Sequence, residues 1–300
     1  MAIKVALAGA TGNLGPAALK ALLEAGFEVT ILSRKDSNST DSLPAHPNQK
    51  VIKVDYNDVE DLRTALQGID VVVSTLAATS FNDRKPLIDA ALTAGVKRFL
   101  PSEFGSDMAN PLNRKLPVFQ GKVETQEYLE KLAKSHPDFT YTYTYNNVFL
   151  DWGLQVGFIM NPKEHKATLY DGGDVPISMT TLATVGKAVV GIIKNLDATK
   201  NRGVCFHDGV FTQKQLIELF KKIDGKEWTT EQASTVDIEK SAYEALKKGE
   251  NISKTMLDFL YRGAFSRDHT PDFTGKVENE LLGLKEMSEE EVIEVLKQFV

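Results

Sequence analysis

The sequence is almost devoid of cysteine and has no long hydrophobic run. Cys205 is the one cysteine among 300 residues, so no internal disulfide can form, as is usual for proteins of a reducing compartment. No apolar stretch approaches the ~18 residues that a membrane span requires. The N-terminus enters a strand-like run at once, without a signal-peptide cleavage site. We therefore expect a soluble, cytoplasmic protein.

An excess of basic residues is also missing. The formal net charge is −6, and no basic tract with interleaved aromatic residues occurs. Because nucleic-acid binding depends on clustered Lys and Arg, we expect neither a nucleic-acid nor a membrane partner. The chain also lacks the G-x-x-x-x-G-K-[ST] and G-x-S-x-G motifs, which excludes a P-loop and a nucleophile elbow. Composition leaves the oligomeric state open between monomer and homodimer.

What is present is a regular alternation of short β-branched runs with helical patterns, which predicts βαβ units and a parallel sheet. The predicted strands are 3–8, 28–33, 51–54, 69–74, 97–100 and 139–145. Helical patterns lie between them near 14–25, 59–67, 84–94 and 120–134. The predicted fold class is α/β, a Rossmann-type doubly wound parallel sheet.

The pattern changes after about residue 150, which predicts two lobes. Residues 1–150 would form the nucleotide-binding domain, and residues 151–300 a smaller, mainly helical substrate-binding lobe. One later strand candidate, 203–207, is expected to return to the large sheet. Ser288 has capping-box spacing to Glu291, which predicts a final helix.

A glycine motif follows the first strand and opens the first helix. It reads Gly9-Ala10-Thr11-Gly12-Asn13-Leu14-Gly15. Glycines allow a tight turn and let backbone N–H groups approach a pyrophosphate, while the positive end of the helix stabilises the anion. Because the strand–loop–helix context is present, a dinucleotide site is favoured over a merely structural turn.

The residues after the second strand indicate the choice of cofactor. An acidic residue there binds a ribose 2′-hydroxyl, whereas an arginine accommodates a 2′-phosphate. Ser33-Arg34-Lys35 occupies this position, which predicts NADP(H). The alternative is a pair of solvated surface charges, and for Lys35 alone this alternative is the stronger one. The long polar loop 35–50 that follows has the character of a functional loop.

Two further features carry a resemblance to a known family. Pro101-Ser102-Glu103-Phe104-Gly105 follows the fifth strand, and Lys122 lies on the next helix, three residues after Phe119. With the glycine motif and Arg34, the chain resembles the NmrA-like, isoflavone-reductase-like branch of the atypical short-chain dehydrogenases. The resemblance extends to about residue 195 and is weaker beyond it. The segment 149–154 is more similar to fungal members than to plant members.

The resemblance implies roles for individual residues. It assigns Lys122 a place beside the nicotinamide and the substrate, with a function in acid–base catalysis. The implied cofactor contacts are Gly9, Thr11, Gly12, Asn13, Leu14 and Gly15 at the pyrophosphate, Arg34 and Lys35 at the 2′-phosphate, Asp55 and Tyr56 near the adenine, Ser74, Thr75 and Leu76 at the middle, and Pro101, Ser102, Glu103 and Phe104 at the nicotinamide. One departure is that Gln126 and Glu127 stand where plant reductases have paired arginines.

Lys122 has a competing interpretation, since lysines are common on helix surfaces. A buried lysine near a cationic nicotinamide would have a lowered pKa and could exchange protons near neutrality. Another candidate, the Y-x-x-x-K pair Tyr243 and Lys247, is rejected because it lies in a charged helix far down the chain. Val118 stands four residues before Lys122, so any reduction must proceed without the usual tyrosine acid.

Residues at the end of the sixth strand are candidates for substrate binding. Asn146, Asn147, Phe149 and Trp152 follow that strand, at the edge where open α/β sheets bind ligands. Apolar rings with a few amides suit a flat, weakly polar substrate, and packing between the lobes is the alternative. Cys205 and His207 would share a strand face but lack further ligands, so no metal site is expected.

The sequence therefore predicts an NADPH-dependent reductase of a small, aromatic or phenolic metabolite, with Lys122 handling the proton. The alternative is an NADP(H)-binding redox sensor without turnover, because a fold does not decide function. A quinone reductase of the same family would differ only in its substrate.

Overall fold

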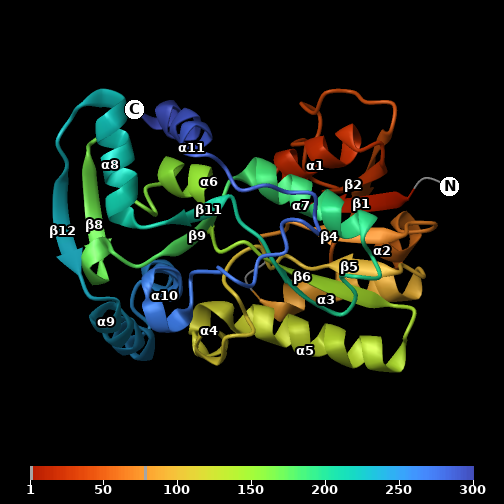
Figure 1. The fold of residues 1–300 in the computed structure, drawn as a ribbon. Coiled ribbons are helices and arrows are strands. Elements are labelled where there is room, and N and C mark those ends of the chain that lie inside the picture. Colours follow the sequence, from red (N-terminus) through yellow and green to blue (C-terminus); the bar gives the residue numbers. More distant parts are fainter. Residues whose placement is uncertain (1–2, 78–79) are drawn as a thin grey trace.

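The computed structural model describes residues 3–77 and 80–300, and Figure 1 shows that they form two lobes. The larger lobe is built on a seven-stranded sheet with strands β1 (Lys4–Ala8), β2 (Glu28–Arg34), β3 (Gln49–Val54), β4 (Val71–Ser74), β5 (Arg98–Leu100), β6 (Thr140–Tyr145) and β10 (Arg202–Cys205). Within the described chain all neighbouring strands of this sheet run parallel, in the order β10–β6–β5–β4–β1–β2–β3. The predicted doubly wound α/β fold is confirmed.

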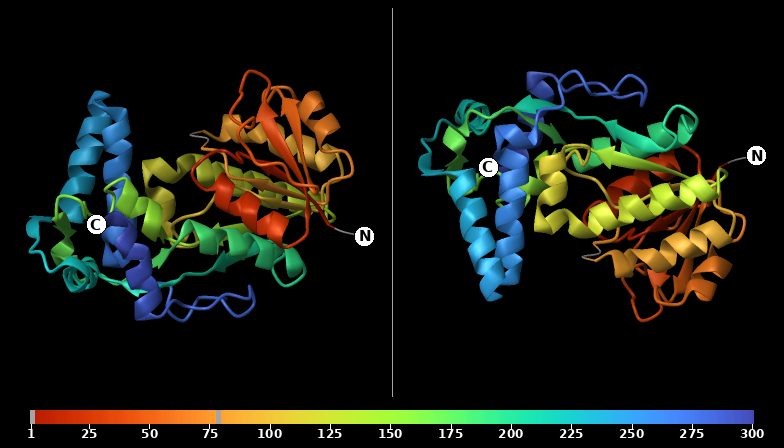
Figure 2. Two further views of the ribbon diagram at one scale, coloured as in Figure 1. Left: turned by 90° about the horizontal axis from the view of Figure 1, so that it is seen from above. Right: turned by 90° about the horizontal axis from the view of Figure 1, so that it is seen from below.

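Helices cover both faces of this sheet, which explains why its strands are apolar on both sides. One face is covered by α1 (Gly15–Glu24) and α7 (Leu182–Lys194), and the other by α2 (Val59–Ala65), α3 (Phe81–Thr93) and α5 (Gln120–Ser135). The two views in Figure 2 show these layers from above and below. In β1, Val5 and Leu7 face the α1 side, whereas Ala6 and Ala8 face the opposite side.

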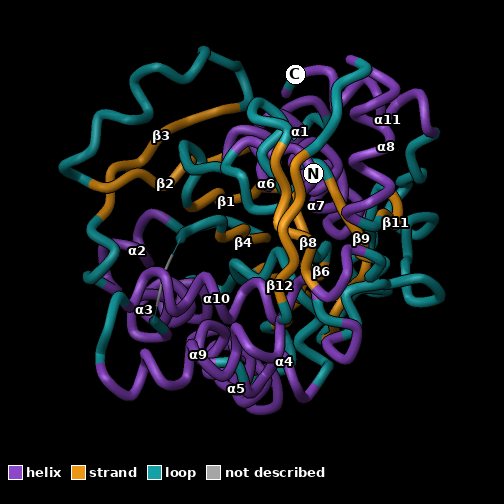
Figure 3. Tube along the Cα trace, turned by 90° about the vertical axis from the view of Figure 1, so that its left-hand side faces the viewer, coloured by secondary structure: helices purple, strands orange, loops and turns teal. Residues whose placement is uncertain are grey.

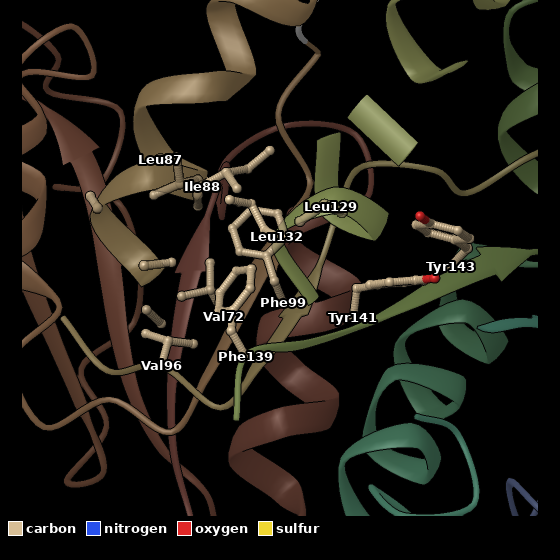
Figure 4. Close-up of a cluster of buried hydrophobic side chains, with 14 of the residues drawn as sticks. Val72, Leu87, Ile88, Val96, Phe99, Leu129, Leu132, Phe139, Tyr141 and Tyr143 are labelled. Atoms are coloured by element: carbon tan, nitrogen blue, oxygen red, sulfur yellow. The ribbon is translucent and has the colours of Figure 1, made fainter. Parts of the chain in front are cut away.

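The core between the sheet and the α3–α5 layer is aromatic and aliphatic (Figure 4). Phe99 of β5 packs against Phe139, with ring centroids 6.4 Å apart, and both rings are buried. Leu129 and Leu132 of α5 close this cluster from above. This packing fixes α5 over β5, and α5 is the helix that carries Lys122.

The chain enters the second lobe after β6 and then returns to the first. Helix α7 packs on α1, and β10 pairs in parallel with β6. The predicted strand at 203–207 therefore joins the large sheet, and α7 joins the large lobe with it. Arg98 links β5 to β6 and to the segment after α7. Its buried guanidinium donates hydrogen bonds to Thr142 Oγ1 at 2.8 Å and to Leu196 O at 2.6 Å.

The second lobe combines helices with two small sheets. Its elements are β7 (Val148–Phe149), α6 (Leu150–Gln155), β8 (Lys166–Tyr170), β9 (Ile177–Thr180), β11 (Gly209–Phe211), α8 (Gln213–Asp224), β12 (Thr229–Ala233), α9 (Thr235–Lys248), α10 (Ile252–Phe265) and α11 (Glu289–Leu296), with α4 (Pro111–Lys115) at the boundary. The sheets are β11–β9–β7 and β12–β8, the latter in the foreground of Figure 3. These strands were not predicted from the sequence, since they are two to five residues long and lack the regular alternation with helices that marks the large sheet. The capping box at Ser288 is present.

No helix within residues 3–77 and 80–300 is both long enough and apolar enough to cross a membrane.

Candidate active site

A cleft of about 970 Å³ lies at the carboxyl ends of the central strands, where open α/β sheets bind their ligands. Its volume is at the upper end of the range for small-molecule sites. The cleft extends from the glycine loop to the junction with the second lobe. Its walls include the predicted site residues Gly9, Thr11, Gly12, Asn13, Leu14, Arg34, Tyr56, Thr75, Leu76, Ser102, Glu103, Phe104, Lys122 and Phe149.

The glycine loop has the geometry of a phosphate-binding turn. Gly9 has φ +90°, and a Cβ atom there would lie 2.8 Å from Thr75 Oγ1. Gly12 N–H donates to Gly9 O at 3.0 Å and closes the turn. A Cβ atom on Gly15 would lie 2.1 Å from Gly9 O, so the helix can pack this closely only with glycine. Gly15 does not line the cleft, and its role is in packing.

The loop leaves the amino end of α1 open to a ligand. Leu14 stands at the N-cap and makes no side-chain capping bond, and a proline occupies the first turn. The first N–H groups of a helix need partners, and together with the helix dipole they bind anions. A Cβ atom on Gly12 would meet nothing closer than Gly9 O at 3.4 Å, so the backbone there is open to close approach. The residues present fit the pyrophosphate of a dinucleotide.

Arg34 and Lys35 have different surroundings. Arg34 is exposed at the cleft wall and makes no ion pair with another described residue. Lys35 points away, and its ammonium pairs with Asp61 of α2 at 2.7 Å. This contact raises the pKa of the exposed Lys35, with Asp61 as the cause. Arg34 is therefore available to a 2′-phosphate, whereas Lys35 is engaged elsewhere.

Hydroxyl groups of the loop after β2 complete this end of the cleft. Ser37, Ser39 and Thr40 line the wall, and Ser39 Oγ lies 3.0 Å from Thr11 Oγ1 and 2.9 Å from Ser37 Oγ. The loop, red-orange at the top of Figure 1, thus folds back onto the glycine loop. These three side chains were not predicted individually as site residues. The length and polarity of the loop were the signal that could have found them.

The predicted adenine and mid-cofactor residues are only partly in the wall. Tyr56 lines the cleft, its hydroxyl donates to Leu32 O at 3.0 Å, and burial raises the pKa of its phenol. Asp55 instead accepts a hydrogen bond from Asn57 N–H at 2.9 Å and lies outside the wall. Thr75 and Leu76 line the cleft, whereas Ser74, one residue earlier at the end of β4, does not.

Lys122 lies at the carboxyl end of β5, inside the cleft. Its ammonium donates to the backbone oxygen of Glu103 and lies 5.8 Å from the centroid of the Phe119 ring. Ser102 and Phe104 line the wall beside it, and Pro101 precedes them outside the wall. Phe104 has φ +22°, an unusual backbone conformation that is typical of functional turns. The PSEFG turn therefore holds Lys122 at this edge of the sheet.

Two other charged groups lie with Lys122. Glu103 is 2% exposed and accepts a hydrogen bond from Gln126 Nε2 at 3.0 Å, and Arg84 of α3 lines the same cleft. Burial raises the pKa of the Glu103 carboxyl, opposed by the charges of Lys122 and Arg84. Burial also lowers the pKa of Lys122, which Glu103 opposes and Arg84 reinforces. Arg84 could not be predicted as a site residue, because a single arginine on a helix has no distinguishing sequence pattern.

Of the four predicted substrate-binding residues, one lies in the wall of the cleft and three lie outside it. Phe149 lines the cleft, and Trp152 packs edge-on against its ring at 6.2 Å without reaching the wall. Asn147 N–H donates to Gly105 O at 2.9 Å, and its side chain donates to Pro271 O at 2.9 Å. Asn146 is fully buried, and its backbone oxygen accepts a bond from Thr180. Both amides lie in the joint between the lobes and outside the wall of the cleft.

The motifs rejected from the sequence lie away from the cleft. Tyr243 and Lys247 are on α9, where the Tyr243 ring packs against Phe259 at 4.8 Å. His207 bonds to Ser178 Oγ at 2.8 Å and to Glu286 at 3.1 Å. Across residues 3–77 and 80–300, no group of three or more His, Cys, Asp or Glu side chains could hold a metal ion.

Comparison with known proteins decides the family. A profile of the NmrA-like family matches residues 1–266. The chain belongs to this family. The oxidoreductase aprR of Aspergillus flavus is 35% identical over 260 residues, which cover 86% of this chain and 86% of that protein. The oxidoreductase poxI of Penicillium oxalicum is 30% identical over 301 residues, covering 97% and 93% of the two chains. This confirms the NmrA-like resemblance predicted from the sequence motifs.

Solved structures show the same fold over the whole length. A structure of AtPrR2 with NADP⁺ and (+)pinoresinol matches with a TM-score of 0.79 and 23% identity, covering 100% of this chain and 99% of that chain. The likeness extends through the second lobe. The family profile also continues to residue 266, so the expectation that the sequence resemblance weakens beyond about residue 195 is wrong.

Proposed function

We propose that this NmrA-like protein is an NADPH-dependent reductase of a small, aromatic or phenolic metabolite, in which Lys122 handles the proton. The observation that carries the proposal is the position of the Lys122 ammonium. It lies at the end of β5, in the cleft that the dinucleotide loop opens. Two relatives are named oxidoreductases, and one structural neighbour holds NADP⁺ and (+)pinoresinol.

The residues divide the work along the cleft. The glycine loop and the amino end of α1 bind the pyrophosphate, and Arg34 with the Ser37 and Ser39 hydroxyls binds the 2′-phosphate. When bound, the cofactor supplies a hydride. Phe104 and Phe149 give the substrate end an apolar wall, and Lys122 donates or accepts the proton at its Nζ atom.

The test is an NADPH-oxidation screen across phenylpropanoid, flavonoid, quinone and aldehyde panels, followed by Lys122→Met on the best substrate. Methionine keeps an apolar stem of similar length but removes the ammonium. We expect kcat to fall ~10²–10⁴-fold, the usual contribution of general acid–base catalysis, with NADPH affinity and thermal stability little changed. Lys131→Met is the matched control, because Lys131 is exposed on the same helix.

The outcomes separate the candidate roles. Unchanged turnover in Lys122→Met would refute the catalytic role, and an equal loss of cofactor affinity would make Lys122 a binding residue. If the wild type binds NADPH but oxidises it with no member of the panels, the redox-sensor alternative is favoured.

A further inference from the structure

The charged groups around Lys122 form a cluster with two cations and one carboxylate. Arg84 comes from α3, Glu103 from the turn after β5 and Lys122 from α5, and all three line the same cleft. The Lys122 ammonium is bound to the backbone oxygen of Glu103, so the two residues are in direct contact. Arg84 NH1 lies 3.4 Å from Thr125 Oγ1, three residues after Lys122 on α5. The three side chains therefore converge on one short stretch of the cleft.

Only one of the two carboxylate oxygens of Glu103 accepts a hydrogen bond from the described residues. Oε2 accepts a hydrogen bond from Gln126 Nε2 at 3.0 Å, whereas Oε1 is buried and accepts none from the described residues. Buried carboxylate oxygens without a donor are costly, so the Glu103 charge depends on the neighbouring cations. Gln126 is itself fixed, because its Oε1 accepts a bond from Arg114 NH1 at 2.8 Å. Its NH2 group also lies 3.2 Å from the Tyr145 hydroxyl.

We propose that Glu103 and Arg84 are positioning residues of opposite charge, which together set the pH range in which Lys122 exchanges a proton. Glu103 favours the ammonium form of Lys122, and Arg84 favours the neutral amine. This inference deepens the proposed function and rests on it for the catalytic consequence. The electrostatic part concerns the protein alone and can be measured without turnover.

Charged and titratable groups on the other packed elements affect Lys122 indirectly, through Glu103 or Arg84. Arg114 of α4 and Tyr145 of β6 face Glu103, and Asp83 of α3 acts on Arg84. On α5, Glu124 and Glu127 are exposed, whereas Glu130 is partly buried and accepts a hydrogen bond from the Tyr143 hydroxyl at 3.4 Å. Buried and partly buried charges are screened much less by salt than exposed charges are. Glu103 is buried and Arg84 partly buried, so we expect these two to have the largest effect on Lys122.

The sign of each effect follows from the charges. Glu103→Gln removes a negative neighbour but keeps the backbone oxygen, so the pKa of Lys122 should fall. Arg84→Gln removes a positive neighbour, so the pKa of Lys122 should rise. Nearby charges commonly shift a pKa by about one unit or more, and we expect shifts of about that size. Glu124→Gln, an exposed carboxylate two residues away, should shift it by less than about 0.3 units.

The experiment is an NMR titration of the cofactor-free protein labelled with ¹³C-lysine. The Cε resonance of Lys122 is identified by its loss in Lys122→Met, and its midpoint is compared among wild type, Glu103→Gln, Arg84→Gln and Glu124→Gln. Opposite shifts in the first two variants support the inference. Shifts in the same direction, or none beyond the Glu124→Gln control, overturn it. If Glu103→Gln does not fold, the upward shift in Arg84→Gln is tested alone, and its absence overturns the inference.

A second measurement keeps the two proposals distinguishable. The limb of the kcat–pH profile that depends on Lys122 should move down in Glu103→Gln and up in Arg84→Gln, by the amounts found in the titration. A titration shift without a shift of the profile supports the electrostatic inference and counts against Lys122 as the proton-handling group. A purely structural role of Glu103 or Arg84 would lower stability without moving the two profiles in opposite directions.

Discussion

Substitutions at Gly12 and Gly15 should separate cofactor binding from folding, because the two glycines face different surroundings. Gly12 lines the cleft, and a Cβ atom there has no neighbour closer than 3.4 Å. Gly15 faces the protein, where a Cβ atom would lie 2.1 Å from Gly9 O and 2.4 Å from the Ala10 carbonyl carbon. Gly12→Val should therefore fold normally and fail to bind the cofactor, whereas Gly15→Ala should lose stability.

The magnitudes follow from these contacts. A Cβ atom at Gly12 makes only ordinary van der Waals contacts, with Gly9 O at 3.4 Å and Thr75 O at 4.0 Å, so the free energy of unfolding of Gly12→Val should change by less than about 1 kcal/mol. The side chain displaces a pyrophosphate from backbone donors worth about 1.5–3 kcal/mol each, so NADPH affinity should fall at least about tenfold per lost bond. Alanine at Gly15 must displace backbone, which costs about 1–3 kcal/mol and outweighs a gain in helix propensity of at most about 1 kcal/mol.

Fluorescence titration with NADPH and thermal unfolding measure the two quantities on the same samples. The reasoning about the loop fails if well-folded Gly12→Val binds NADPH as the wild type does. The steric argument fails if the unfolding temperature of Gly15→Ala equals that of the wild type.

Three further predictions test other parts of the molecule. Wild-type protein should bind NADPH at least about tenfold more tightly than NADH, and Arg34→Ala should abolish the preference by weakening NADPH alone, since one charge-assisted contact contributes about 1.5–3 kcal/mol; equal wild-type affinities in parallel titrations would contradict this. Arg98→Met should lower the free energy of unfolding in urea by about 2–4 kcal/mol, because the 2%-exposed guanidinium bonds to four oxygens; an unchanged midpoint would disprove its fastening role. Burial raises the pKa of the Cys205 thiol to about 12, so iodoacetamide at pH 8 should label it only in urea, and rapid native labelling detected by mass spectrometry would rule this out.

The parts of the fold that the sequence predicts are those with a strong local signal. β1 and the glycine motif are contiguous, and the order strand, turn, helix fixes their geometry. The small sheets of the second lobe lack such a signal, because strands such as β7, two residues long, form only through distant partners. Strand β12 is mostly exposed, and it pairs with β8 across more than sixty residues of chain.

The same distinction applies to the site. Arg34 and Lys35 are adjacent and chemically alike, yet Asp61, far along the chain on α2, draws Lys35 away from the cleft. Asn147 lies at the expected edge of the sheet, but its side chain donates a hydrogen bond to Pro271 O in the joint between the lobes. Local pattern places a residue at an edge, and tertiary partners then decide where its side chain points.

The burial of charge at the substrate end of the cleft argues for chemistry there rather than for cofactor sensing alone. Moving an ion from water into a protein interior costs several kcal/mol, even after the protein relaxes around the charge. A nucleotide sensor needs the glycine loop and Arg34, and these lie at the other end of the cleft. Neither the partly buried Lys122 nor the buried Glu103 is needed to hold a phosphate. Groups in a cleft whose pKa values are shifted by burial are typical of sites that move protons. Burial raises the pKa of Glu103 and lowers the pKa of Lys122. The burial of this pair therefore supports the proposal that Lys122 handles a proton.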